Sequence, residues 1–173
     1  MNFYLKVINF LLNKFGKETV CEGNWLGNDT ISRTITDINK IIFYADKTGV
    51  LQKNKQRKYL IVADMIISGE KDGPLRPSPK NVGMIAVGEN PVYFDEVIAK
   101  IMGAKLNKIN TFLRVRQSAE SKYPLCEKKV EGFIVSPDKR FANKTLHEIK
   151  GDAVLYFKPQ GQGWEEAFYK QKT

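Results

Sequence analysis

Histidine and cysteine are scarce in this sequence, which holds one histidine and two cysteines in 173 residues. Cys21 and Cys126 lie far apart and form no CxxC pair, which excludes a thiolate-based zinc or iron–sulfur site within this chain and indicates a reducing compartment, the cytoplasm. Each cysteine is more typical of a small buried hydrophobe than of a nucleophile. His147 is a lone histidine without catalytic partners beside it, so we expect a structural role. If a metal binds, oxygen ligands remain, which favour a hard cation such as Mg²⁺.

Long hydrophobic runs and familiar catalytic motifs are also missing. No stretch is long enough to span a bilayer. The sequence contains no P-loop lysine motif, no GxGxxG, no GxSxG and no HExxH. It therefore names no reaction.

Negative charge is in short supply, with 19 acidic against 28 basic residues and a formal net charge of +9. Such an excess suits an anionic small molecule, an anionic polymer or a membrane surface. The lysines are spread from Lys6 to Lys172 without a long basic run. This distribution favours a solvated basic surface over a dedicated track for a polyanion.

The first 22 residues are predicted to be an amphipathic helix and a connector, followed by one α/β domain over residues 23–173. Seven apolar residues between Phe3 and Phe15 recur at helical spacing, and Gly16 ends the segment. We expect this stripe to pack against protein, in this chain or in a partner. Anchoring at a membrane surface is the alternative.

The remaining chain alternates helical and strand patterns. Asn28, Asp29 and Thr30 supply N-cap chemistry for a helix to about Ala45, and its apolar stripe is Ile31, Ile35, Ile38, Ile42 and Ala45. Asn90 and Pro91 begin another helix, which Gly103 ends. A further helix is expected over residues 106–117.

Four segments read as strands: residues 59–67, 82–87, 130–136 and 153–158. The first has apolar residues on both pleat faces, which is typical of a strand inside a sheet covered on both sides. Together these patterns predict an α/β fold, with a mixed or mostly parallel sheet and helices on both faces.

Asp64 interrupts the first of these apolar strands. A buried carboxylate there would cost several kcal/mol unless it were paired or ligated. Ligands of α/β sheets gather at the carboxyl ends of strands, and residues 68–81 after it read as a long loop. Gly69 and Gly73, with three prolines, suggest an ordered binding loop that presents Glu70, Asp72 and Arg76. The alternative is a purely structural, hydrogen-bonded Asp64.

Two further segments are candidates for ligand binding. The helix that begins at Asn90 and Pro91 offers free backbone N–H groups to an anion, and Asp95 lies one turn into it. The second segment places Trp25, a stacking surface, beside the hydrogen-bonding side chains of Asn28, Asp29 and Arg33. For both segments, an ordinary capped helix is the competing interpretation.

Three blocks of the sequence resemble the C-terminal half of the domain of unknown function 362 family, which is bacterial and archaeal. They are GNWLGNDTISRTITDINKIIFYADKTGVLQ, RKYLIVADMIISGEKDGPL and PKNVGMIAVGENPVYFDEVIAKIMG, covering about residues 23 to 118 with a terminal Gly163-Trp164. The family's motif residues fall on Gly27 to Thr30, Arg33, Thr34, Asp64, Ile66, Gly69, Glu70, Gly73, Pro74, Asn90, Pro91, Val92 and Asp95. Met65 stands where the family usually has glycine.

The resemblance implies a ligand site but no settled reaction. Some family members are fused to ferredoxin-type iron–sulfur modules, whose cysteines are absent here. The family's N-terminal half is also missing, so a separate N-terminal half or another chain is an expected partner. Relatives that carry the GNDT block, which is residues 27–30 here, resemble proteins whose genes accompany those for surface polysaccharides.

The leading hypothesis is therefore an enzyme of unknown reaction with a carboxylate-lined site. Its ligand-binding residues are Asn28, Asp29, Arg33, Asp64, Glu70, Gly73, Asn90 and Asp95, of which Asp64, Glu70 and Asp95 would hold Mg²⁺. The first alternative is a non-catalytic basic module that binds an anionic polymer or a partner chain. The second is an inactive half-domain that lacks its partner.

Overall fold

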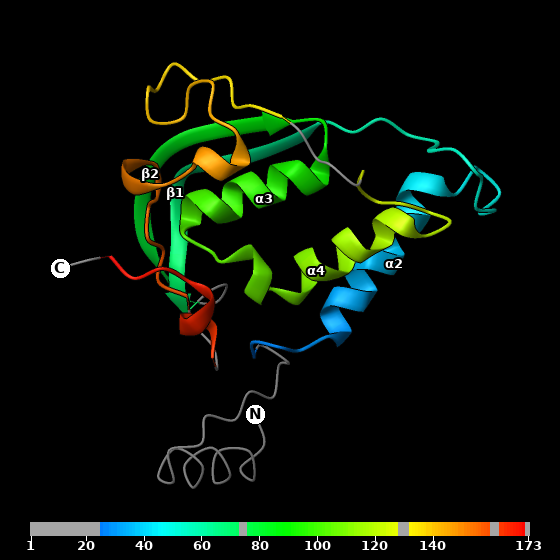
Figure 1. The fold of residues 1–173 in the computed structure, drawn as a ribbon, viewed down its shortest axis with the longest axis horizontal. Helices are drawn as coiled ribbons and strands as arrows, with labels where there is room; N and C mark the ends of the chain where they lie inside the picture. The colour runs from blue at the N-terminus through cyan, green and yellow to red at the C-terminus, as the bar shows by residue number, and fades with distance from the viewer. Residues whose placement is uncertain (1–24, 73–75, 128–131, 160–162, 172–173) are drawn as a thin grey trace, which may run out of the picture.

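The computed structural model describes residues 25–72, 76–127, 132–159 and 163–171. Three α-helices and one pair of strands lie in this part of the chain (Figure 1): α2 (Thr30–Tyr44), β1 (Ile61–Asp72), β2 (Arg76–Gly88), α3 (Pro91–Met102) and α4 (Asn110–Gln117). Five short 3₁₀ helices complete it: η1 (Leu106–Lys108), η2 (Ser118–Glu120), η3 (Leu146–Glu148), η4 (Gly151–Ala153) and η5 (Trp164–Ala167). None of these helices is long and apolar enough to cross a membrane. The predicted N-terminal helix falls outside the described residues.

The sheet is a two-stranded antiparallel ribbon, so the predicted mixed or mostly parallel sheet with helices on both faces is wrong. Val62 pairs with Val87 near one end and Asp72 with Arg76 at the other. Only residues 73–75 separate the strands, whereas a parallel pair needs a crossover of about a dozen residues or more. Strands were also expected over residues 130–136 and 153–158. The described residues of these segments, 132–136 and 153–158, form no strand.

The expected binding loop at residues 68–81 is largely strand. Gly69 pairs with Pro79, and Lys71 with Pro77. A Cβ atom on Gly69 would lie 2.7 Å from the Cβ of Pro77, so the glycine permits this close approach. Proline is tolerated in a strand whose N–H side has no neighbour, and β2 has β1 on one side only. The sequence predicts a positive φ angle for Gly73, because it precedes Pro74, and this residue lies outside the described part of the chain.

Helix α3 begins and ends as its sequence predicts. The Asn90 side chain accepts hydrogen bonds from the backbone N–H groups of Val92 and Tyr93, both at 3.1 Å. Gly103 ends the helix in the left-handed conformation, with φ of 94°. Helix α3 lies along the inner side of the curved ribbon (Figure 1), and Met84 of β2 packs against the cluster that contains Val97 and Ile101.

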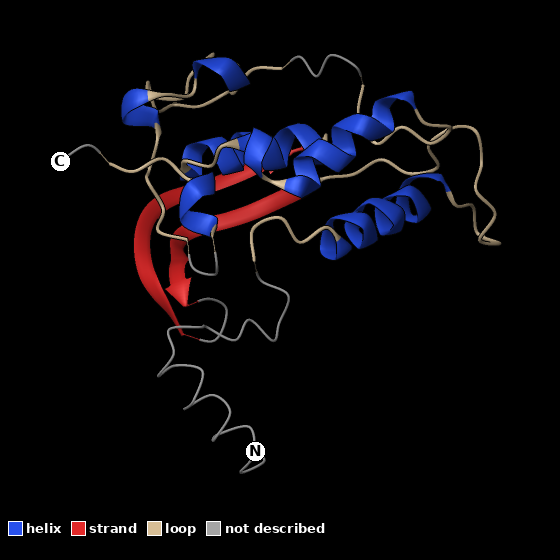
Figure 2. Cartoon of the chain, turned by 60° about the horizontal axis from the view of Figure 1, so that its bottom comes forward, coloured by secondary structure: helices blue, strands red, loops and turns tan. Residues whose placement is uncertain are grey.

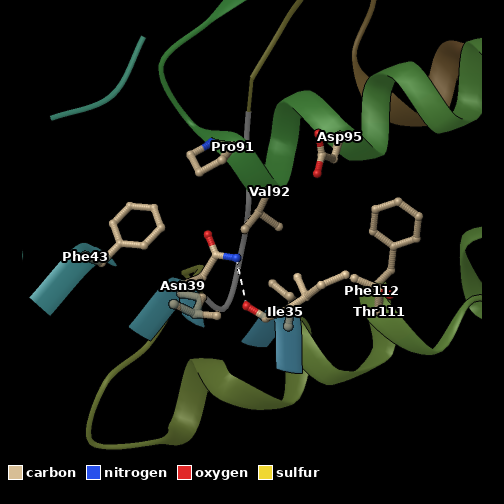
Figure 3. A pocket seen from close by; sticks show the side chains of 10 residues that line it. Ile35, Asn39, Phe43, Pro91, Val92, Asp95, Thr111 and Phe112 are labelled. Carbon is tan, nitrogen blue, oxygen red and sulfur yellow. Dashed lines mark hydrogen bonds between the residues drawn. The ribbon is translucent and has the colours of Figure 1, made fainter. Parts of the chain in front are cut away.

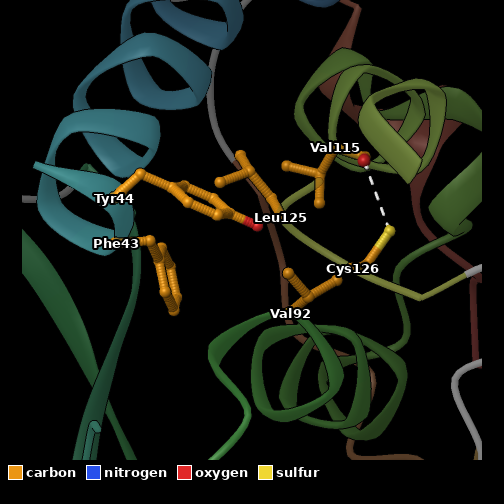
Figure 4. Packing of buried hydrophobic residues seen from close by; sticks show 6 residues of the cluster. All are labelled: Phe43, Tyr44, Val92, Val115, Leu125 and Cys126. Carbon is orange, nitrogen blue, oxygen red and sulfur yellow. Dashed lines mark hydrogen bonds between the residues drawn. The ribbon is translucent and has the colours of Figure 1, made fainter. Parts of the chain in front are cut away.

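A second core cluster joins α2, α3 and α4. Its buried members are Phe43, Tyr44, Val92, Val115, Leu125 and Cys126 (Figure 4). The Cys126 thiol donates to the Val115 carbonyl oxygen at 3.3 Å, and burial raises the pKa of this thiol. Cys126 is therefore a buried hydrophobe, as expected.

Helix α2 turns its isoleucines towards solvent. Its buried residues are Ser32, Thr36, Phe43 and Tyr44, and the Ser32 hydroxyl lies 3.2 Å from the Thr111 hydroxyl of α4. The exposed fractions along the predicted apolar stripe are 50% for Ile31, 37% for Ile35, 48% for Ile38 and 39% for Ile42. Only Ala45 of that stripe is buried.

Helix α3 lies on one side of the curved ribbon (Figure 2), and apolar side chains on the ribbon's other side are exposed. Large apolar side chains on the ribbon, and Leu60 just before β1, are 50–70% exposed. Those on the ribbon are Val62, Ile66, Ile67, Ile85 and Val87. The expectation that both faces of the sheet are covered is therefore wrong for the described residues.

The cap of α3 provides the first prediction. Asn90→Ala removes the acceptor of two helix N–H groups and should lower the free energy of unfolding by about 1 kcal/mol, measured by urea denaturation. Asn54→Ala is the control, because the Asn54 side chain is exposed and only its backbone carbonyl is used, by Gln56. Equal losses for the two variants would show that the cap contributes nothing.

Candidate functional site

Asp64 lies on the outer, solvent-facing side of the ribbon. It pairs with Ile85 across the strands, and both residues are exposed. Its Oδ1 atom accepts a hydrogen bond from the backbone N–H of Ile66 at 3.0 Å. The carboxylate therefore sits in water among apolar side chains.

Glu70 fastens the far end of the ribbon to the C-terminal part of the chain. Its side chain is 10% exposed and its Oε2 atom lies 3.6 Å from the Lys80 ammonium group. The same oxygen accepts from the backbone N–H of Lys158 at 3.0 Å. The neighbouring Lys71 N–H donates to the Lys158 carbonyl oxygen at 2.9 Å. Both bonds hold β1 and residue 158 together.

Asp95 lies on α3 at a small pocket between α2, α3 and α4 (Figure 3). The pocket has a volume of about 50 Å³ and a mostly apolar wall that includes Ile35, Val92 and Phe112. Asp95 is exposed as a residue, and partial desolvation of its carboxyl group raises the pKa of Asp95. The volume suits water molecules rather than a metabolite, whose pockets span roughly 300–1,000 Å³.

These three carboxylates are not brought into one group. Among residues 25–72, 76–127, 132–159 and 163–171, no three His, Cys, Asp or Glu side chains are placed to hold a metal ion. Asp64 faces outwards from the ribbon, Glu70 contacts the segment at Lys158, and Asp95 faces α2 and α4. The side chains of Asp72 and Arg76, and the whole of Gly73, lie outside the described part of the chain.

The GNDT block joins α2 to α4. Asp29 Oδ2 accepts from Arg33 Nε at 2.6 Å, and the Arg114 guanidinium donates to both Asp29 oxygens, with Nε 2.8 Å from Oδ1. The hydrogen bonds from Arg114 and Arg33 lower the pKa of Asp29 to about 2. Asp29 is the N-cap of α2 but its side chain makes no capping hydrogen bond, and Asn28 before it accepts from the Thr30 N–H at 2.9 Å.

Beside this ion pair lies an open groove of about 410 Å³, lined by Arg33, Lys40 and Arg114 among others. Both arginines are paired with Asp29, and Lys40 lies 3.1 Å from Asp37. Two carboxylates, Asp29 and Asp37, pair with these three cations, so about one net positive charge remains at the groove. Trp25, the expected stacking surface, is 43% exposed and does not line it.

Two charged contacts were missed by the sequence reasoning. Arg114 lies 85 positions from its partner Asp29, and no local pattern connects them. Glu96 is fully buried, its Oε1 atom accepts from Arg116 Nε at 2.8 Å, and its Oε2 atom has no hydrogen-bond partner in the described residues. The sequence carried one signal, because Glu96 follows the buried Val92 by four positions on the same helix face.

The described structure is a module of three α-helices and one antiparallel ribbon. Several of its charged residues join different elements, while apolar residues on α2 and the ribbon are exposed. A family model described as Domain of unknown function (DUF362) matches residues 9–100, more than half of the chain. The chain belongs to this family, which confirms the resemblance drawn from the three sequence blocks. No curated protein and no solved structure matches the chain.

The Asp29 ion pair has a defined pH dependence. Because its folded pKa of about 2 is below the ordinary 3.8, its contribution to stability is present above about pH 4 and is lost as the pH falls through about 2. Arg114→Gln removes the main cause, so the pKa of Asp29 should rise towards 3.8, measured by NMR titration of the carboxyl carbon.

The matched control for this titration is Arg140→Gln. Arg140 lowers the pKa of Asp138 in the same way, so its loss should raise the pKa of Asp138 and leave that of Asp29 unchanged. An Asp29 pKa that stays near 2 without Arg114 would contradict the assignment.

Glu70 is expected to stabilise the folded state. Glu70→Ala leaves the Lys158 N–H without its charged acceptor and should lower the free energy of unfolding by about 1–3 kcal/mol. The control is Glu89→Ala, since Glu89 is exposed and its loss should cost no more than about 0.5 kcal/mol. If thermal denaturation shows the two variants to be equally stable, the described contacts of Glu70 do not hold the ribbon end.

Proposed function

We propose that this chain is a protein-binding module, whose open ribbon face and exposed α2 stripe dock onto an acidic polypeptide. The observation that carries the proposal is the exposure of large apolar side chains on both elements. Soluble proteins rarely expose contiguous apolar patches beyond a few hundred Å², and larger patches mark interaction sites.

The ribbon face is the first of two exposed apolar surfaces, and the α2 stripe is the second. Val62 and Val87 pair directly across the strands and are 60% and 61% exposed. Ile85 beside them is 63% exposed. In a two-stranded sheet each strand also has one edge without a neighbouring strand, which offers backbone groups to an added strand. Apolar burial and strand addition both favour a polypeptide as the occupant.

The charge of the chain favours an acidic occupant over a second copy. Two copies carrying +9 each repel one another, whereas an acidic chain is attracted and steered to the surface. A separate N-terminal half of the family domain is one polypeptide that would meet this description if it is acidic.

Asp64 sets a specific requirement on this partner. Its carboxylate lies opposite Ile85 on the apolar face, so docking would remove it from water. Such a group costs several kcal/mol unless it receives hydrogen bonds or a positive charge. The partner should therefore place an arginine, a lysine or backbone N–H groups opposite Asp64.

An enzyme linked to surface-polysaccharide metabolism is the competing proposal. Its carboxylate site requires Asp64, Glu70 and Asp95 to act on one ligand, with Mg²⁺ if a metal takes part. Their different surroundings give it less support than the exposed apolar faces give to docking.

Site-specific photocrosslinking tests the docking proposal, and it is carried out in the cells that naturally produce this protein. A photoreactive amino acid at Ile85 or Ile38 should yield an adduct with one polypeptide that has more acidic than basic residues. The same amino acid at the exposed Lys139 should not. An adduct between two copies of this chain, or no adduct at Ile85 and Ile38, would contradict the proposal.

The polypeptide identified in this way allows a quantitative test. Val62→Thr with Val87→Thr keeps β-branched side chains but removes two methyl groups from the apolar face, so calorimetry should show binding weakened about tenfold. Val50→Thr is the control, because Val50 is 57% exposed outside the helices and strands. Equal affinities for both variants would count against the ribbon face.

A further inference from the structure

A pocket of about 500 Å³ lies between the end of β1 and the C-terminal segment of the chain. Its volume is that of a small-molecule site. Four aromatic residues and three lysines line it, together with Pro159, Glu165 and Gln171: Tyr156, Phe157, Phe168, Tyr169, Lys71, Lys158 and Lys170. The pocket is separate from the ribbon face and the α2 stripe of the proposed function.

The walls of this pocket are fixed to the end of α3. The Phe157 N–H donates to the Met102 carbonyl oxygen at 2.9 Å, and the Tyr169 N–H donates to the Gly103 carbonyl oxygen at 2.8 Å. Phe168 forms an isolated bridge with Ala104. Two segments of the C-terminal region are thus held on one helix end, so the pocket is formed before any ligand enters.

Strained backbone is concentrated at the same place. Of the described residues other than glycine, three have positive φ angles: Lys71 at 65°, Asn143 at 58° and Tyr156 at 47°. Two of the three line the pocket. Such conformations are strained and cluster at ligand sites. For a bulky residue such as Tyr156, positive φ is a genuine outlier.

The lining chemistry selects an anion that carries a ring. Three lysines against the single Glu165 leave an excess of positive charge at the pocket, and lysine binds phosphate as a point charge. Phe157 is buried, whereas Tyr156, Phe168 and Tyr169 are at least partly exposed and supply surfaces on which a ring stacks. Two of the aromatic rings also contact lysines that do not line the pocket. Lys105 Nζ lies 5.3 Å from the ring centroid of Tyr169, and Lys80 Nζ lies 5.2 Å from that of Phe157.

From this combination we infer that the pocket binds a small phosphorylated ring compound, with the phosphate group at the lysines and the ring against the aromatic wall. A nucleotide and a sugar phosphate share this chemistry. The inference is independent of the docking proposal, because none of the pocket residues belongs to the exposed apolar faces.

Calorimetry on the full chain at low salt tests the site with four probes: adenosine monophosphate, glucose 1-phosphate, adenosine and inorganic phosphate. At least one of the two phosphorylated ring compounds should bind saturably and at least tenfold more tightly than inorganic phosphate or adenosine. Preference for the first indicates a nucleotide, and preference for the second indicates a sugar phosphate.

Variants then place the binding in this pocket. Lys71→Gln with Lys158→Gln should weaken the phosphorylated probe at least tenfold, and Tyr169→Ala should weaken it without changing the affinity for inorganic phosphate. Lys139→Gln with Lys53→Gln is the matched control, since both lysines are exposed and line none of the described pockets. No probe binding more tightly than inorganic phosphate, or equal weakening in the control, would overturn the inference.

Discussion

The antiparallel pairing of β1 with β2 determines how the rest of the described structure is arranged. Three residues separate the strands, so they pair with each other and form a long curved ribbon. Helix α3 follows β2 directly and packs on the inner side, where Met84 meets the cluster of Val97 and Ile101. A sheet of two strands has two faces, and one helix layer covers one of them. The outer face, with Val62 and Val87, remains exposed.

Two charged residues that suggested a ligand site, Asp29 and Glu70, act together with Glu96 as ties between elements. Asp29 connects α2 to Arg114 of α4, Glu70 connects β1 to Lys158, and Glu96 connects α3 to Arg116. Glu96 is the most demanding of these, because a buried carboxylate is stable only when it is paired. Asp64 is different, since its hydrogen bond is to the N–H two residues further along its own strand. It is therefore the acid on the apolar face that a partner can still engage.

Local signals in the sequence predicted the helices well. Asn90, Pro91 and Gly103 mark the ends of α3 because capping depends on a few neighbouring residues, and α2 was expected to end one residue after Tyr44. Strands were predicted over residues 59–67 and 82–87, and both lie largely within β1 and β2. Their continuation through residues 68–72 and 76–81 was missed, because Gly69 and the prolines at 77 and 79 are typical of loops and are accepted in β2 only because it has no neighbouring strand beyond it. Which strand pairs with which also depends on residues that are distant in the sequence, so local patterns do not predict it. The Asp29–Arg114 pair was missed for the same reason.

The isoleucines of α2 show the limit of periodicity as evidence. A stripe at i, i+4 and i+7 predicts which face of a helix is apolar, but it does not say what covers that face. The sequence therefore predicted the stripe correctly, whereas only the structure shows that Ser32 and Thr36 face α4 and that Ile31 and Ile38 face solvent.

Amide hydrogen exchange tests the docking account most directly. The chain alone is compared with the complex that it forms with the acidic polypeptide, purified from the producing cell at low salt. The account predicts added protection in the partner-bound state at β1, β2 and α2, with the amides of α3 unchanged. Added protection confined to other elements, or none at the ribbon and α2, would contradict it.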